Sequence, residues 1–257
     1  MDLITSAKNP AIRALRGLRE RSGRAESGKI LVEGEVMIRE ALKCGLQIHE
    51  LIADEKHESL AAEMEGLGAR AHIVPRNLLE SVCDTKTPQG VCAGFDAPAA
   101  ATISDLPDII VALDGVQDPG NLGTIWRTAD AAGFRGLLIG SGSADPLSPK
   151  VLRAAMGSGF RIPFAQADCL ADALKALKAR GFTLIASDLS GADFYSRPNP
   201  GKKLVLIIGN EARGISDTVR ECADMRVKLP MRGGAESLNA AIAAAILMYD
   251  LMREYEG

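Results

Sequence analysis

Short apolar runs alternate with amphipathic stretches along the second half of the chain. Between residues 108 and 230 the runs are DIIVALDGV, RGLLIG, FRIPFAQ, TLIASD, KLVLIIGN and MRVKLP, and helical periodicity lies between them. Strands that are apolar throughout are typical of parallel sheets buried on both faces. The pattern predicts an α/β fold with a mostly parallel sheet and helices on both faces.

The first half has the same alternation on a smaller scale. From residue 30 to about residue 95, the runs KILVEG, IHELIAD, AHIVP and GVCAGF alternate with the helical patterns EVMIREALKCG, ESLAAEMEGLG and RNLLESVC. The stretch DAPAAATISDLPD that follows is rich in Ala and Pro and lacks periodicity, as a linker does. We therefore predict a small N-terminal α/β domain with a helical arm over residues 1–97, a linker over 98–107 and a larger domain over 108–257.

The N-terminal arm carries most of the positive charge. Asn9-Pro10 can begin a helix in which Ile12, Leu15 and Leu18 form a narrow apolar stripe. Residues 1–29 have a net charge of +4, which leaves −7 for the rest of a chain whose total is −3. The basic face is either a solvated surface or an RNA-binding one. For the second case the candidate contacts are Arg13, Arg16, Arg19 and Arg24.

Composition excludes several classes of protein. The chain has 257 residues, 47% hydrophobic and 25% charged, which is ordinary for a soluble globular protein. Its five cysteines are scattered, which favours reduced thiols in a cytoplasmic protein. The N-terminus lacks a leader pattern, and the most apolar run, residues 240–248, is about half the length that spans a bilayer. The three histidines have no ligand spacing, so we expect no metal site.

Three loops share one pattern of apolar strand, glycine-rich polar loop and helix start. They lie in LDGVQDPGNLGTIWRTADAAG (113–133), LVLIIGNEARGIS (204–216) and LPMRGGAESLNAAIAAAIL (229–247). Turn formers and helix-capping residues are dense in the first of them. Three such loops in one domain predict one shared site.

In order and spacing, these blocks resemble the motifs of the SpoU-type (TrmH-like) RNA ribose 2'-O-methyltransferases of the SPOUT class. The residues that carry the resemblance are Asn121, Arg127, Gly209-Asn210-Glu211, Arg213-Gly214 and Ser237-Leu238-Asn239. Leu31-Val32-Glu33-Gly34 resembles the start of the family's small substrate-binding domain. The resemblance implies a C-terminal trefoil knot, S-adenosyl-L-methionine as cofactor, and a homodimer in which both protomers build each site.

The resemblance also implies a role for each motif residue. The cofactor-binding set is Gly209, Asn210, Gly214, Leu229 and Leu238. The catalytic set is Asn121, Arg127, Glu211, Ser237 and Asn239. A guanidinium with a pKa above about 12 is a poor base, so we expect Arg127 to bind the phosphate beside the target ribose and to polarise its hydroxyl. Taken singly, these residues could equally be helix caps and surface charges.

Some positions depart from the family's commoner pattern. Trp126 stands where a smaller aliphatic residue is usual, Ala155 where serine is frequent, and Ala240-Ala241 where Val-Ser is usual. We expect Trp126 to affect how the target nucleotide stacks.

Two apparent nucleotide-binding motifs are rejected because the residues around them do not fit. GRAESGK at 23–29 has Ile30 in place of the magnesium-binding hydroxyl of a phosphate loop and follows no strand. The stretch from Gly140 begins like a dinucleotide fingerprint but has Asp145 in place of the third glycine.

The sequence therefore predicts an S-adenosylmethionine-dependent RNA 2'-O-methyltransferase, with ribosomal RNA preferred to transfer RNA as the predicted substrate. The alternatives are a transfer RNA 2'-O-methyltransferase and a non-catalytic RNA-binding factor of ribosome assembly. A dinucleotide-dependent enzyme is disfavoured by Asp145.

Overall fold

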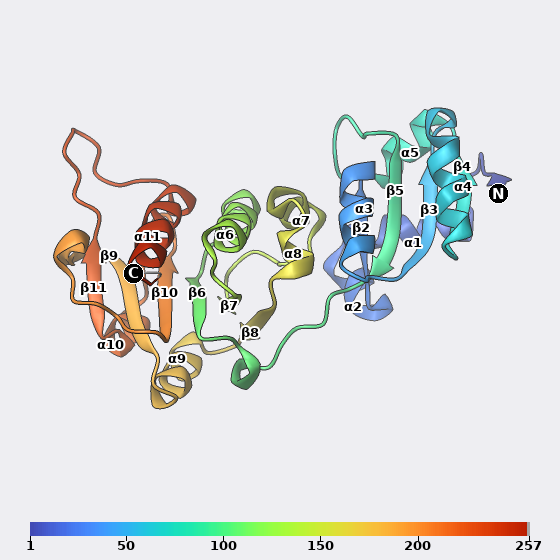
Figure 1. Cartoon of the computed structure of the whole chain (residues 1–257). Coiled ribbons are helices and arrows are strands. Elements are labelled where there is room, and N and C mark those ends of the chain that lie inside the picture. Colours follow the sequence, from blue (N-terminus) through green and yellow to red (C-terminus); the bar gives the residue numbers. More distant parts are fainter. Residues whose placement is uncertain (256–257) are drawn as a thin grey trace. The chain divides into compact units, whose positions relative to one another are not determined.

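The computed structural model describes residues 1–255 and is drawn in Figure 1. Contacts divide the chain into two compact units. The first contains Met1–Ala99 and Asp145–Phe160, and the second contains Ala100–Ala144 and the chain from Arg161 onward. None of the described helices has the length and apolar character needed to cross a membrane.

The first unit is built on a mixed five-stranded sheet with the order β1-β4-β3-β5-β2. Its strands are β1 (Asp2–Leu3), β2 (Lys29–Glu33), β3 (Ile48–Ala53), β4 (Arg70–Ile73) and β5 (Val91–Asp96). Helices of this unit are α1 (Pro10–Gly17), α2 (Arg21–Ser27), α3 (Glu35–Lys43), α4 (Glu58–Gly66), α5 (Arg76–Val82) and α7 (Pro149–Ala155), with the short η1 (Glu55–His57). Strand β5 runs antiparallel to both β2 and β3, whereas β4 pairs in parallel with β1 and β3.

The helical arm begins as its sequence predicts. The Asn9 side chain accepts a hydrogen bond from the Ala11 amide at 2.8 Å and caps α1, with Pro10 in the first turn. Ile12, Leu15 and Leu18 are buried, so the predicted apolar stripe is confirmed. The P-loop-like stretch 23–29 is mostly the second helix, α2, and not a loop.

The second unit has a six-stranded sheet in which every pairing is parallel, with the order β11-β9-β10-β6-β7-β8. The strands are β6 (Ile109–Asp114), β7 (Gly136–Gly140), β8 (Phe164–Ala167), β9 (Thr183–Asp193), β10 (Leu204–Gly209) and β11 (Met225–Lys228). This confirms the predicted α/β fold with a parallel sheet. The chain runs from β6 outward to β7 and β8 and then crosses to the other side of β6, so the topology reverses between β6 and β10.

Helices cover both faces of this sheet (Figure 1). They are α6 (Pro119–Ala132), α9 (Leu170–Ala179), α10 (Asp217–Cys222) and α11 (Ala240–Tyr255), with η2 (Ile103–Asp105) and η3 (Phe194–Ser196) as short connections. The short α8 (Ser158–Arg161) begins in the first unit and ends at Arg161, which belongs to the second. One face, which includes Ile110, Val205 and Ile207, packs against α9 and α10. On the opposite face α6 packs against α11. The helix start that follows β6 therefore lies beside the helix that ends the chain.

The stretch predicted to be a linker is partly packed against the second unit. The Ala101 amide donates to the Phe164 carbonyl at 2.8 Å, and Ile103 packs against the hydrophobic core formed with α9. The domain limits placed after residues 97 and 107 stay predictions.

Candidate active site

The site begins where β6 and β10 end side by side. These strands pair in register from Leu204 with Ile109 to Gly209 with Asp114. The Asp114 Oδ2 accepts a 2.6 Å hydrogen bond from the Ser216 amide, and the Asn210 Nδ2 donates to the Gly115 carbonyl at 2.8 Å. The loops after the two strands are therefore fastened to each other. Ligands of open parallel sheets commonly bind at such a reversal of strand order.

The loop after β10 requires its glycines. The amides of Asn210 and Gly214 each donate to the other's carbonyl at 2.9 Å, which folds the chain back on itself. A Cβ on Gly209 would lie 2.3 Å from the Gly214 carbonyl carbon, so only glycine fits there. Gly214 has a φ of +69°, in the left-handed region that favours glycine. This folding holds the backbone of 210–214 in one shape.

Side chains from all three motif loops form one hydrogen-bonded chain. The Asn121 Nδ2 donates to Glu211 Oε1 at 2.7 Å, and its Oδ1 accepts from Asn239 Nδ2 at 3.0 Å. The Asn239 Oδ1 also accepts from the Ala241 and Ile242 amides and so caps α11. The Asp118 Oδ1 accepts from the Asn121 amide at 2.8 Å and caps α6. The structure therefore brings Asn121, Glu211 and Asn239 together, with two helix starts holding them.

A bulge in β9 supplies another wall of the site. Strand β11 pairs with β9 at Ala186 and then at Ala192, so Ser187–Gly191 have no partner in β11. A Cβ on Gly191 would lie 2.5 Å from the backbone of Arg226 and Val227, which makes glycine necessary where the bulge rejoins the ladder. The sequence prediction named TLIASD as a strand but missed the polar residues after Ala186, whose only signal was the Ser-Asp-Leu-Ser-Gly composition.

A cavity of about 530 Å³ lies between this bulge, the loop after β10 and the segment before α11. Every predicted cofactor-binding residue lines it, together with two of the predicted catalytic residues: Gly209, Asn210, Gly214, Leu229, Leu238, Glu211 and Ser237. Asn121, Arg127 and Asn239 are not among its lining residues. Residues that the sequence reasoning missed include Asp188, Met231 and Arg220.

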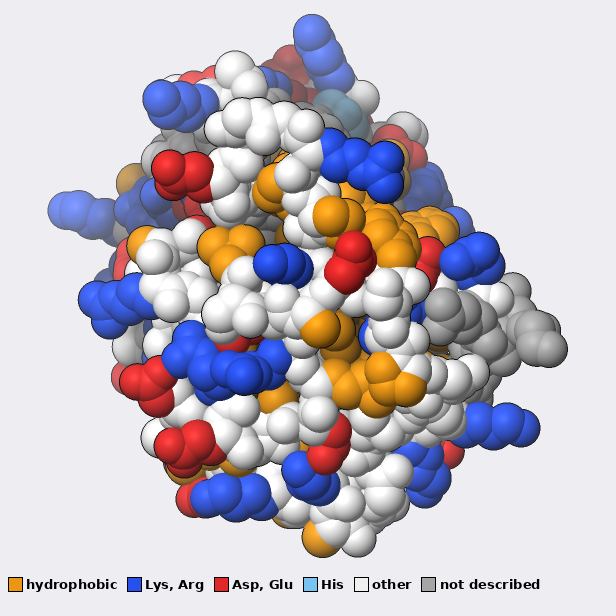
Figure 2. All heavy atoms as spheres, turned by 90° about the vertical axis from the view of Figure 1, so that its left-hand side faces the viewer, with side chains coloured by type: hydrophobic (Ala, Val, Ile, Leu, Met, Phe, Trp, Pro, Cys, Tyr) orange, Lys and Arg blue, Asp and Glu red, His pale blue; other side chains and the backbone are white. Residues whose placement is uncertain are grey.

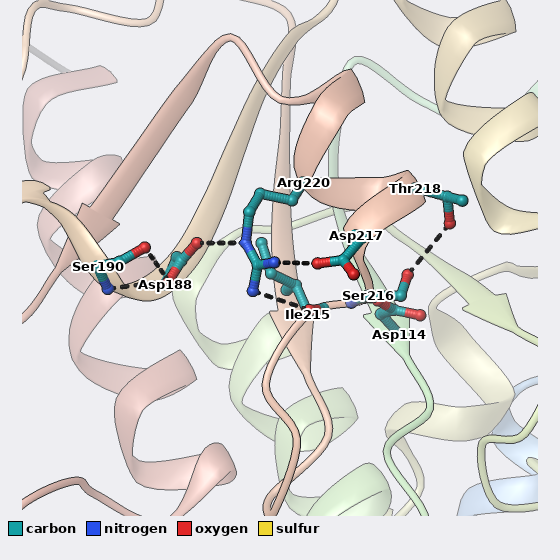
Figure 3. A network of polar contacts seen from close by, with 8 residues as sticks. All are labelled: Asp114, Asp188, Ser190, Ile215, Ser216, Asp217, Thr218 and Arg220. Carbon is teal, nitrogen blue, oxygen red and sulfur yellow. Dashed lines mark hydrogen bonds and ion pairs between the residues drawn. The ribbon is translucent and has the colours of Figure 1, made fainter.

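Arg220 ties two walls of the cavity together (Figure 3). Its Nε donates to Asp188 Oδ2 at 3.0 Å, and its Nη2 donates to the Ile215 carbonyl at 3.3 Å. A third contact joins the same guanidinium to Asp217. Burial would raise the pKa of the Asp188 carboxyl, but hydrogen bonds from the Ser190 amide and hydroxyl and from Arg220 outweigh it and lower that pKa below its usual value. Asp188 is therefore a fixed carboxylate at the cavity wall.

Arg127 lies on α6, away from the cavity. Its side chain is exposed, and within residues 1–255 no hydrogen bond or ion pair engages its guanidinium. The cation is thus free to meet a group from outside this chain.

Trp126 has a different place from the one predicted. Its side chain is fully buried, its Nε1 donates to the Ile162 carbonyl at 3.2 Å, and its ring meets Phe164 edge-on with centroids 5.3 Å apart. The expectation that Trp126 affects nucleotide stacking is therefore wrong, because α6 turns this side chain into the core.

The four arginines of the arm also differ from one another. Arg13 and Arg19 are exposed, and the Arg16 Nη2 donates to Ser81 Oγ at 2.7 Å while remaining partly exposed. Arg24 is only 6% exposed, and it donates to the carbonyls of Leu18 and Arg19 and pairs with Asp145. Arg24 is corrected from a candidate RNA contact to an internal cross-link of the first unit.

Other chemistry is sparse in the part of the chain that the structure describes. No cluster of three or more His, Cys, Asp or Glu side chains there is arranged to hold a metal ion. The five cysteines are free thiols, and three of them are buried.

Comparison with known proteins agrees with the site. Residues 108–249 match the model of the SpoU rRNA Methylase family, and residues 9–93 match that of the MRM3-like substrate binding domain. The Bacillus subtilis (strain 168) protein named 23S rRNA (guanosine(2553)-2'-O)-methyltransferase RlmP is 35% identical over 252 residues, which cover 98% of this chain and 99% of that protein.

Two solved structures bound to AdoMet, which is S-adenosylmethionine, have the same fold over nearly their whole length. The rRNA methyltransferase of Sinorhizobium meliloti has a TM-score of 0.87 and 33% identity, over 99% of this chain and 98% of that one. The SpoU methyltransferase AviRb of Streptomyces viridochromogenes has a TM-score of 0.85 and 29% identity, over 97% and 99%. On the match over residues 108–249 and the likeness along the whole chain, this protein belongs to the SpoU rRNA methylase family.

Proposed function

We propose that this protein transfers a methyl group from S-adenosyl-L-methionine to the 2'-hydroxyl of a ribose in ribosomal RNA. The observation that carries the proposal is the 530 Å³ cavity, which is lined by the second and third motif loops. Glu211 lines this cavity and is hydrogen-bonded to Asn121, which in turn is hydrogen-bonded to Asn239. The predicted enzyme class and cofactor are confirmed at the level of the family. Ribosomal RNA is favoured over transfer RNA because two of the three whole-length relatives described above, from Bacillus subtilis and Sinorhizobium meliloti, are named for it.

The cavity fits the proposed cofactor in size and in chemistry. Its volume is within the range of about 300–1,000 Å³ that small-molecule sites occupy. Ile208, Leu229 and Leu238 offer apolar surface for an adenine ring, and the folded 210–214 backbone offers fixed polar groups beside it. Glu211 and Asp188 add carboxylates suited to the cofactor's positive charges.

The residues of this chain then have to position the RNA. When bound, S-adenosyl-L-methionine would supply a methyl group on a sulfonium, and the leaving group would be its thioether, S-adenosylhomocysteine. The ribose 2'-oxygen, held in line, would form the new C–O bond and lose its proton to solvent. Arg127 would hold the phosphate next to the target ribose and donate toward its hydroxyl, since a guanidinium fork matches phosphate geometry. Asn121 would fix the position of Glu211 through their 2.7 Å hydrogen bond.

A homodimer would complete the site. Ile242, Ile246 and Tyr249 are 37–56% exposed and follow one another at helical spacing along α11. Figure 2 shows exposed hydrophobic side chains gathered between charged ones on one face of the molecule. Arg127 lies on α6, which packs against α11, and is not among the residues that line the cofactor cavity. We propose that the α11 stripe pairs with a second copy and that the partner's Arg127 approaches the cofactor cavity.

A trefoil knot is part of the same proposal. Strand β11 lies at the edge of the sheet, yet the chain returns from it to place α11 against β10 and α6 near the middle. The returning segment passes the β9 bulge and the loop after β10, and all three line the cavity. This return path is the one that a knotted chain would take.

The test combines binding with transfer. Calorimetry should detect S-adenosyl-L-methionine binding to the whole protein, and tritiated cofactor should label ribosomal RNA at ribose 2'-oxygens. Label in transfer RNA alone would support the transfer RNA alternative. If the protein does not bind the cofactor, or if it binds RNA without transferring a methyl group, the proposal is contradicted and a non-catalytic RNA-binding factor is favoured.

The dimer has its own test. Ile242→Asp should convert the protein to an inactive monomer in light scattering, whereas Leu67→Asp, at a similarly exposed apolar position in the first unit, should not. A monomeric Ile242→Asp protein with full activity would contradict the shared site.

A further inference from the structure

A second cavity lies entirely within the first unit, between the helical arm and the sheet. Its volume is about 380 Å³, and none of the residues that line it lines the cofactor cavity. Ala14 provides exposed apolar surface in it, and the buried Leu15, Leu18 and Gly94 lie beneath. Glu26, Ser27 and His49 provide hydrogen-bonding groups around that surface.

Glycines let the arm pack closely beside this cavity. A Cβ on Gly94 of β5 would approach the Leu15 Cδ2 to 3.1 Å, so glycine allows the buried Leu15 of α1 to pack directly on the strand. A Cβ on Gly23 would lie 2.2 Å from the Gly17 carbonyl oxygen, so the two arm helices can meet closely only at glycine. The arm thus packs closely on the sheet and on itself, and the cavity lies beside these contacts.

Unpaired positive charge surrounds the cavity. Neither the Arg13 guanidinium nor the Lys29 ammonium has a hydrogen bond or ion pair within the described chain. The acidic Glu50 is already compensated, because it accepts from Arg70 at 2.8 Å and from His72 at 2.8 Å. Arg13 and Lys29 are therefore available to an anion.

The P-loop-like stretch 23–29 finds its place here. Gly23, Glu26, Ser27 and Lys29 all line the cavity. Because residues 23–27 of this stretch lie in helix α2, their backbone amides cannot cradle a phosphate as a P-loop does. It offers side chains instead, namely a carboxylate, a hydroxyl and an ammonium group.

We propose that this cavity binds one unstacked nucleotide of the substrate RNA. The base would lie against the exposed Ala14 and the half-buried Gly17 and Gly23. Its edge would face Glu26 and Ser27, and Arg13 and Lys29 would hold the flanking phosphates. Sequence-selective RNA recognition targets bases that are splayed out of a helix, and positively charged grooves hold the backbone of such unpaired strands. The inference rests on the proposed function and names where its substrate is read.

Paired substitutions on the same arm test the pocket. Ala14→Phe fills the cavity from α1, and Ala25→Phe places the same bulk on an exposed site of α2 outside it. Arg13→Glu reverses a charge at the cavity, and Arg21→Glu does so at an exposed arginine outside it. The readouts are RNA affinity with S-adenosylhomocysteine present, its salt dependence, cofactor affinity, and thermal denaturation to show that each protein folds.

We expect Ala14→Phe to lower RNA affinity about tenfold, the size of effect that loss of one base-stacking platform produces. Arg13→Glu should also lower it and should reduce the slope of log affinity against log salt by about 0.7 or more. Ala25→Phe should resemble the wild type, Arg21→Glu should weaken binding less than Arg13→Glu, and cofactor affinity should be unchanged throughout. Photocrosslinking of 4-thiouridine RNA should label peptides that contain residues 13–29.

Other outcomes would overturn the inference. If Ala14→Phe binds RNA like the wild type while Arg13→Glu and Arg21→Glu weaken it equally, the arm is a diffuse basic surface without a nucleotide pocket. If the wild type methylates RNA and Ala14→Phe also does so with unchanged RNA affinity, the cavity does not bind a nucleotide and the proposed function still stands. If the wild type neither binds nor methylates RNA, the proposed function itself fails.

Discussion

The side-chain amide of Asn121 donates a 2.7 Å hydrogen bond to the carboxylate of Glu211, 90 residues further along the chain. The bond joins the start of α6 to the loop after β10, and Asn239 extends it to the start of α11. One asparagine therefore links the three loops whose pattern stands out in the sequence.

Replacing Asn121 by aspartate should break this link. The amide donor would become a second carboxylate beside Glu211, and like charges at hydrogen-bond distance repel each other. We expect Asn121→Asp to lower kcat by at least about tenfold, because each increase of about 1.4 kcal/mol in the activation free energy lowers the rate tenfold. The loss of stability should be smaller. Single-turnover transfer and thermal denaturation measure the two effects. Equal activity of Asn121→Asp and the wild type would remove Asn121 from the site.

Gly209 should tolerate no side chain. A Cβ there would meet the Gly214 backbone at 2.3 Å, so Gly209→Ala must open the folded loop at a cost of about 1–3 kcal/mol. We expect cofactor affinity to fall sharply in calorimetry. Gly233→Ala is the matched control, because its Cβ would meet nothing within 4 Å. Similar cofactor affinities for the two variants would contradict this account of the loop.

Trp126 should act through stability alone. Trp126→Ala removes a fully buried ring and should cost about 3–5 kcal/mol of unfolding free energy. Trp126→Phe keeps most of the packing but loses the hydrogen bond to Ile162, so it should melt lower and still methylate RNA at the wild-type rate. A Trp126→Phe protein of unchanged stability with impaired RNA binding would restore the nucleotide-stacking role.

Asp188 should stabilise the protein only while it is ionised. Its folded-state pKa lies below the ordinary 3.8, so its contribution is present above that pH and is lost as pH falls through the folded-state pKa. The stability difference between wild type and Asp188→Asn should therefore be largest at neutral pH and shrink in acid below the ordinary value. Asp217→Asn, at the exposed partner of the same arginine, should change stability by less than about 1 kcal/mol. A stability difference between wild type and Asp188→Asn that grows as the pH falls would contradict a lowered pKa of Asp188 in the folded protein.

Much of the fold can be read from the sequence because buried parallel strands are apolar throughout. Each of the six apolar runs after residue 108 overlaps a strand of the second unit, and every pairing in that sheet is parallel. The meeting of Asn121 and Glu211 also follows, since the loops after neighbouring parallel strands emerge at one edge of the sheet. Asn239 follows the edge strand β11 and reaches them only because the chain returns toward the middle of the sheet.

What the sequence could not reveal depends on distant partners. Arg24 looks like its exposed neighbours in the arm until Asp145, 121 residues away, pairs with it. Trp126 and Arg127 are adjacent, and only the packing of α6 decides that one is buried and the other exposed. The β9 bulge and the Asp188–Arg220 pair arise from the register with β11, which no local pattern encodes.

The most direct measurement is mass-spectrometric mapping of 2'-O-methyl nucleotides in ribosomal and transfer RNA from cells with and without this protein. The account predicts that one mark in ribosomal RNA disappears, returns with the wild-type gene, and does not return with Arg127→Ala, although that variant folds and binds cofactor. A complete set of marks in cells that lack the protein, when the parent cells express it, would contradict the account.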